Sequence, residues 1–126
     1  MNNETETIEQ TPVGHLYGKV IGIFKLQTQL EAFITQLGTT VVGDVESLSG
    51  LNGTKQLESW KESFSQYFFG EMEIKMLQLY LDAAAVDLIV FAVEVESDLA
   101  NETAELAKAN GAVNVVYFGN SVVTNY

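Results

Sequence analysis

The sequence contains no cysteine and no arginine, and it has a single histidine and a single proline in 126 residues. The lack of cysteine excludes disulfides, thiol catalysis, iron–sulfur clusters and thiolate zinc sites. One histidine excludes both a two-histidine metal site and a pair of histidines that act as acid and base. We therefore expect no bound cofactor.

Positive charge is also scarce. All basic residues are lysines, six against 17 acidic residues, which gives a formal net charge of −11. Nucleic acids and anionic membranes are bound mainly by lysine and arginine side chains that neutralise phosphates. The sequence therefore predicts neither a nucleic-acid partner nor a membrane partner.

Long apolar runs are missing as well. No segment approaches the roughly 18 uninterrupted apolar residues that a membrane-spanning helix needs. A secretory signal requires a basic start followed by an apolar stretch of about 7–15 residues. Residues 1–11 carry three glutamates, no basic residue and no such stretch. We therefore expect a cytoplasmic protein.

The length and composition of the chain are those of a single globular domain. Chains of about 100–200 residues form one domain, and 47% hydrophobic with 18% charged residues is a globular composition. Residues 1–12 are polar, acidic and without periodicity, which predicts a disordered lead-in. We expect residues 13–126 to form a single α/β domain.

Hydrophobic periodicity predicts an alternation of strands and helices. Thr28 and Glu31 have the spacing of a helix cap, although that helix could also start a turn earlier, at Leu26. The glycine-containing residues 49–53 predict a turn, and Gly119–Asn120 predicts a two-residue hairpin turn before a short fifth strand. The expected strands are 16–25, 39–48, 87–96 and 113–118, and the expected helices are 26–37, 54–69, 71–86 and 97–110.

This order predicts a mixed α/β (α+β) fold, a ferredoxin-like βαβ-αα-βαβ sandwich with a helical insertion between strands 2 and 3. The alternative is a small doubly wound parallel sheet. In the third strand, Ile89, Phe91, Val93 and Val95 alternate with Leu88, Val90 and Ala92. Both faces of that strand are therefore apolar, and the inserted helices, a second subunit, or both must cover the second face. This two-faced strand motivates the prediction of a homodimer.

Two blocks carry a resemblance to a known family. They are the strand VIGIF at Val20–Phe24, with the amphipathic helix after it, and the closing block GAVNVVYFG at Gly111–Gly119. Together they resemble a family of bacterial general stress proteins, which includes the low-temperature-induced proteins of cyanobacteria. The resemblance extends over most of the chain from Val20 onward. The sequence departs from it in the aromatic helix around Trp60 and Phe64, where a glycine-rich hinge is expected. The resemblance implies a stress context, and it implies no catalytic residue.

Two groups of residues are candidates for binding a small molecule. His15 is the one side chain whose unperturbed pKa lies near neutrality, and its alternative role is an ordinary surface contact. Trp60, Tyr67 and Tyr80 belong to an aromatic series that could line a pocket for a flat ligand. Aromatic side chains at helical spacing are more often part of a core or an interface.

Four carboxylates are the candidate metal ligands. Asp44 and Glu46 share one face of the second expected strand, and Glu94 and Glu96 share one face of the third. On neighbouring strands they could bind a divalent cation through oxygen, or they could simply be solvated. Residues 50–55, GLNGTK, lack the spacing of a phosphate loop, because only two residues separate the glycines and threonine precedes lysine.

Three functional classes remain open. The favoured one is a non-enzymatic, stress-associated binding or assembly module that acts as a homodimer. The second is a sensor domain that binds a small ligand. The third is an enzyme of the dimeric α/β-barrel type that uses His15. The composition alone does not choose among them.

Overall fold

A computed structural model of the chain describes residues 18–38, 45–48, 50–66, 71–119 and 123–126, with the backbone alone at 50, 61–66 and 71–73. The lead-in 1–12 and the candidates His15, Asp44 and Tyr67 lie outside the described residues. The elements in chain order are β1 (Lys19–Phe24), α2 (Gln27–Leu37), β2 (Glu46–Ser47), α3 (Gly50–Gln66), α4 (Glu71–Ala85), β3 (Ile89–Glu94), the 3₁₀ turn η1 (Ser97–Leu99), α5 (Ala100–Ala109), β4 (Val113–Phe118) and β5 (Val123–Asn125).

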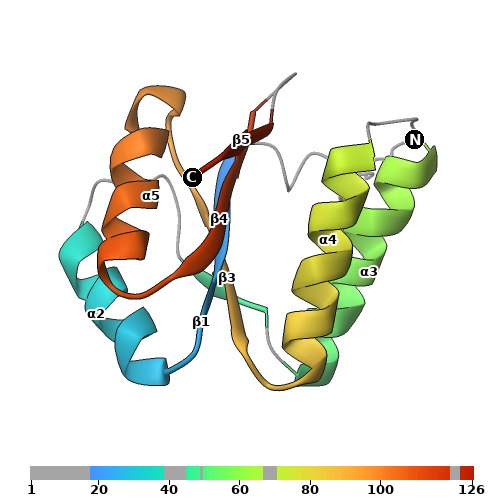
Figure 1. Cartoon of the computed structure of the whole chain (residues 1–126), viewed down its shortest axis with the longest axis horizontal. Helices are drawn as coiled ribbons and strands as arrows, with labels where there is room; N and C mark the ends of the chain where they lie inside the picture. Colours follow the sequence, from blue (N-terminus) through green and yellow to red (C-terminus); the bar gives the residue numbers. More distant parts are fainter. Residues whose placement is uncertain (1–17, 39–44, 49, 67–70, 120–122) are drawn as a thin grey trace, which may run out of the picture.

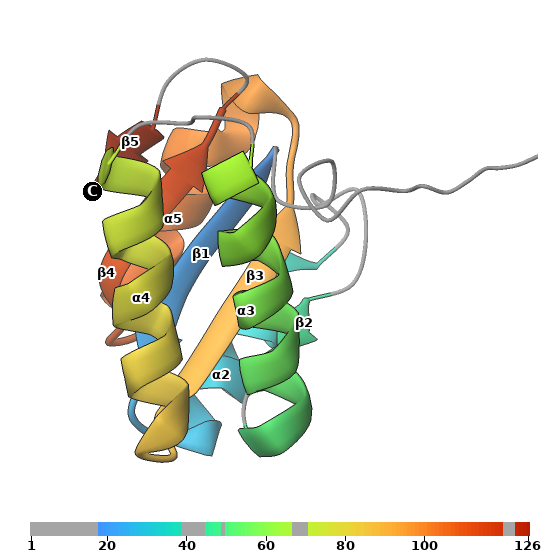
Figure 2. The same cartoon turned by 90° about the vertical axis from the view of Figure 1, so that its right-hand side faces the viewer.

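The strands form one five-stranded sheet in the order β2-β3-β1-β4-β5, and every pairing is antiparallel. This order confirms the ferredoxin-like plan and excludes the doubly wound parallel sheet. Helices α2 and α5 cover one face of the sheet, and α3 and α4 cover the other (Figure 1). Seen from the side of the inserted pair, α3 and α4 lie next to each other across β1 and β3 (Figure 2).

The alternation of β3 explains the second helical layer. Phe91 and Val93 pack into the core beneath α2 and α5, and Val90 and Ala92 pack into the core beneath α3 and α4. The inserted helices of the same chain therefore cover the second apolar face. The prediction that this face needs cover is confirmed, but the cover does not require a second subunit. The two-faced strand consequently no longer supports a homodimer.

Helix α2 begins where the helical periodicity begins, but its cap differs from the predicted one. Leu26 is the first flanking residue, and its backbone N–H donates to the Gln29 side-chain oxygen at 3.2 Å. The Lys25 backbone N–H donates to the same oxygen at 3.2 Å. The Gln29 side chain therefore accepts from the two backbone N–H groups that directly precede α2. The predicted cap at Thr28 is wrong, and the alternative start a turn earlier, at Leu26, is confirmed.

The predicted turn over residues 49–53 is also wrong, because α3 begins at Gly50 and includes Gly53. A Cβ atom at Gly53 would collide with the backbone of Leu48. Glycine is therefore required here because the start of α3 packs against the end of β2. Its presence in the sequence reflects close packing and not a turn.

Strand β4 contains an irregularity and a longer connection than predicted. Its register against β1 shifts between Ile21 and Ile23, and Asn114 adopts a positive φ of 53° at that shift. The fifth strand is confirmed, since Phe118 pairs with Val123. Four residues therefore separate the paired positions, and the two-residue turn at Gly119–Asn120 is wrong.

Candidate functional site

The two aromatic candidates that the structure describes, Trp60 and Tyr80, have no exposed surface. Both lie in the core between the sheet and the helices α3 and α4. Neither lines either of the two recesses described below. Their helical spacing thus marks a core face, and a ligand-binding role for these residues stays a prediction.

Tyr80 has a specific structural role in that core. Its single O–H donates to the backbone oxygen of Asn114 at 2.6 Å, and the backbone oxygen of Ile21 lies 3.4 Å from the same hydroxyl. These carbonyls lie at the register shift of β4, where the regular ladder is interrupted. Burial raises the pKa of the Tyr80 phenol, which keeps it protonated and able to donate. Tyr80 therefore supplies a hydrogen-bond donor to a backbone carbonyl in the irregular part of β4.

Trp60 takes part in a cluster around a buried cation. The ammonium of Lys19, on β1, lies 5.6 Å from the centroid of the Trp60 ring and 3.0 Å from a carboxylate oxygen of Glu46. Lys19 is 5% exposed, whereas the Glu46 side chain is 44% exposed. The Trp60 indole N–H is buried without a hydrogen-bond acceptor among the described residues. The cluster fixes the short strand β2 to β1 across β3.

The described carboxylates do not gather into a metal centre. Glu46 is ion-paired with Lys19, and Glu94 lies in register with Lys19 on the neighbouring strand and is exposed. Glu96 is exposed beyond the end of β3. No group of three metal-ligating side chains occurs within the described ranges. The four-residue site also needs Asp44, so it stays a prediction.

One recess, of about 470 Å³, lies where β2 meets the start of α3. Residues 50–55 form the first turns of α3 here and not a glycine loop around an anion. The carboxylate of Glu46 in the wall would repel a phosphate. The lining residues are Glu46, Ser47, Leu48, Asn52, Gly53 and Gln56.

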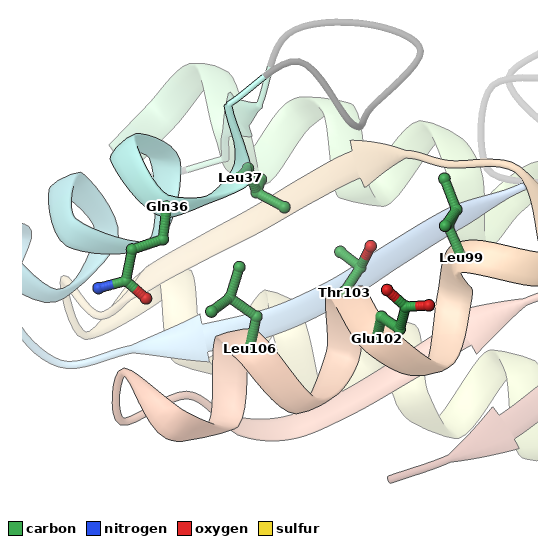
Figure 3. Close-up of a pocket in the computed structure, with 6 residues that line it drawn as sticks. All are labelled: Gln36, Leu37, Leu99, Glu102, Thr103 and Leu106. Carbon is green, nitrogen blue, oxygen red and sulfur yellow. The ribbon is translucent and has the colours of Figure 1, made fainter.

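A second recess, the α2/α5 groove, lies on the opposite face of the molecule. Its volume is about 270 Å³. Leu37 of α2 and Leu106 of α5 lie on its two sides, with Gln36 at one end, Leu99 of η1 at the other and Glu102 beside Thr103 on α5 (Figure 3). The lining residues are Gln36, Leu37, Leu99, Glu102, Thr103 and Leu106.

The side chains that face the sheet explain why these two helices leave a groove. Helix α2 buries large side chains, Leu30, Phe33 and Leu37. Helix α5 buries small ones, among them Ala104 and Ala107. Small side chains let α5 approach the sheet closely, while α2 is held further out, and we attribute the recess to this mismatch.

Hydrogen bonds between the helices set the limit of the groove on the side of Gln36. The amides of Gln36 and Asn110 exchange two hydrogen bonds, of 3.1 and 3.5 Å, between residues 74 positions apart. Beyond this pair, the side-chain amide of Gln29 lies against Gly111, whose positive φ of 101° favours glycine. The groove is therefore bounded by side chains that the fold holds in place.

Sequence reasoning missed both this groove and the buried lysine. Lys19 had one signal, its position inside the apolar strand KVIGIF. The groove had a weaker signal, since Leu99 and Leu106 are seven residues apart and each follows an acidic residue, Asp98 and Glu105. These leucines are half-buried and not fully covered.

Comparisons with protein-family models, curated proteins and solved structures find no match to this chain. Among the described residues, no helix has both the length and the apolar character needed to cross a membrane.

Proposed function

We propose that the protein is a non-enzymatic binding module that recognises a partner protein through the α2/α5 groove. The observation that carries this proposal is the groove itself, a recess of about 270 Å³ with half-buried Leu99 and Leu106 in its wall. The leucine side chains in its wall suit an anchoring apolar side chain of a macromolecular partner.

The distribution of reactive groups supports a role without catalysis. The buried phenol of Tyr80 donates to backbone carbonyls, and the ammonium of Lys19 is paired with Glu46. The groove presents the hydroxyl of Thr103 and the carboxylate of Glu102 as its acidic or nucleophilic groups. Activation of a hydroxyl nucleophile requires an adjacent base held by a third group, and the groove offers no such set among the described residues.

The arrangement of the layers weighs against the enzyme alternative. A dimeric α/β barrel needs a free sheet face on each subunit, and here α3 and α4 occupy that face (Figure 2). His15, which that alternative requires, lies outside the described residues. The stress context, the homodimer and the cytoplasmic location stay predictions of the sequence.

The proposal is tested by partner capture with matched variants. The parent, Leu106→Ser in the groove and Leu51→Ser on α3 would be immobilised and exposed to an extract of the source cells. Leu51 is 72% exposed on the opposite face, so its variant controls for loss of a surface leucine. We expect the parent and Leu51→Ser to retain a protein that Leu106→Ser loses, provided that all three melt cooperatively.

Native mass spectrometry of the purified chain completes this test. We expect the mass of the polypeptide alone. A stoichiometric small molecule retained through purification would contradict the proposal and favour the sensor alternative. Equal retention of every protein by Leu106→Ser and the parent would also contradict it.

A further inference from the structure

We infer that the occupant of the α2/α5 groove is a basic amphipathic helix of another protein, which inserts an apolar side chain between the two helices and places lysines or arginines over α5. This inference rests on the proposed function and specifies the chemistry of the partner. The charge and the apolar wall along one side of α5 carry it.

The acidic residues of this region form a stripe along η1 and α5. Asp98, Glu102 and Glu105 are spaced four and three residues apart, and all three are exposed. Side chains at such spacings lie above one another on one side of a helix. The stripe therefore runs along the length of α5 and is not scattered around it.

The groove wall lies beside this stripe. Leu99 and Leu106 each follow an acidic residue by one position, which turns them about 100° around the helix, toward α2. Seven residues separate the two leucines, a distance of about 10 Å along the helix axis. An apolar row and an acidic row thus run parallel over two turns, the complement of an amphipathic helix with a basic edge.

Little positive charge offsets the stripe. Lys108 is the one basic residue in η1 and α5, and its ammonium lies 3.8 Å from Glu105. Asp98 and Glu102 form no ion pair with another described residue. The whole chain carries −11, so its field attracts basic partners and repels acidic ones before contact. The same charge repels the phosphates of nucleic acids and anionic membranes.

The geometry of the groove favours a helix over a single small cation. The walls come from two helices, and the recess is apolar at Leu37, Leu99 and Leu106 (Figure 3). A third helix laid between two others inserts its apolar row in this manner. The acidic side chains lie at the rim, where they favour encounter and orientation more than burial.

The test uses two labelled helical peptides of the same pattern, one of leucine and lysine and one of leucine and glutamate, and measures binding by fluorescence anisotropy. The variants are Glu102→Lys at the groove, Leu106→Ser in its wall and Glu58→Lys on α3. Glu58 is exposed on the opposite face of the sheet, so Glu58→Lys makes the same change of net charge away from the groove.

We expect the leucine–lysine peptide to bind the parent, and the leucine–glutamate peptide to bind at least about tenfold more weakly. Glu102→Lys should weaken the leucine–lysine complex about three- to tenfold, and Glu58→Lys less than about twofold. Leu106→Ser should weaken it at least about fivefold, and added salt should lower the affinity.

Other outcomes separate the inference from the proposed function. Equal weakening by Glu58→Lys and Glu102→Lys would overturn the inference, because net charge alone would then drive binding. Tight binding of both peptides, lost in Leu106→Ser, would overturn the basic partner while leaving the groove as a docking site. Binding of neither peptide, or binding that Leu106→Ser leaves unchanged, would overturn both.

Discussion

Tyr80 shows how a single polar group can stabilise an irregular strand from the far side of a core. Its hydroxyl donates to the carbonyl oxygen of Asn114 at 2.6 Å. In Tyr80→Phe this part-buried acceptor loses its donor, which should cost about 1 kcal/mol in the free energy of unfolding. Chemical denaturation measures the loss. Tyr117→Phe, on a half-buried tyrosine of β4, serves as the control, and equal losses in both variants would contradict this role.

The same phenol predicts a dependence of stability on pH. Burial raises the pKa of Tyr80 in the folded state above the value of about 10 in the unfolded chain. The protonated form is therefore favoured by folding, so the contribution to stability is complete below pH of about 10. It is lost as the pH rises above that value. We expect stability to fall less steeply above pH 10 in Tyr80→Phe, and identical slopes would rule out this coupling.

Trp60 lies wholly inside the core, with Lys19 over its ring. Truncation of a buried aromatic side chain to alanine typically costs about 3–5 kcal/mol. We therefore expect Trp60→Ala to lower the melting temperature strongly. A variant that melts like the parent would show that the indole is not part of the core.

At the scale of the elements, the sequence was informative wherever a pattern was local. The alternation in β3 predicted two buried faces, and the order of strands and helices predicted the ferredoxin-like sheet. The sequence was misleading at Gly53, because glycine is typical of turns. The true reason for this glycine is its close approach to the backbone of Leu48, and that contact is visible only in the folded structure. The cap at Gln29 was missed because Thr28 is the more usual capping residue.

The groove and the shifted strand were beyond prediction for a related reason. The groove joins α2 to α5, and its limit depends on a pair 74 residues apart, Gln36 and Asn110. The carbonyl of Asn114, at the register shift of β4, accepts its hydrogen bond from Tyr80, which is 34 residues away in the sequence. Side-chain periodicity reports which residues face inward on one element, and it carries no information on how two elements meet.

Gly53 gives a prediction at the level of the contact between β2 and α3. Alanine is normally favoured over glycine inside a helix by about 1 kcal/mol. Here the added Cβ would collide with the Leu48 backbone, so we expect Gly53→Ala to destabilise the protein. Asn52→Ala, at the exposed neighbouring position, should be neutral or stabilising. Thermal melts compare the two, and a stabilised Gly53→Ala would show that α3 does not pack against β2 in this way.

At the scale of the whole molecule, the charge of −11 should make the folded state repel itself. Salt shortens the range of that repulsion to about 10 Å at 0.1 M, so added sodium chloride should raise the melting temperature. Calcium at matched ionic strength should act like sodium, because solvated carboxylates respond to ionic strength and not to one particular cation. A calcium-specific rise that disappears in Glu94→Gln would instead establish the carboxylate site.

The central claim is that this chain recognises a partner through α2 and α5, while α3 and α4 complete the core. Amide chemical shifts of the isotope-labelled protein, recorded with and without the leucine–lysine peptide, test this directly. We predict saturable changes concentrated at Leu37, Leu99, Thr103 and Leu106, with the amides of α3 and α4 largely unmoved. Changes concentrated on α3 and α4, or spread evenly over the acidic surface, would contradict the account.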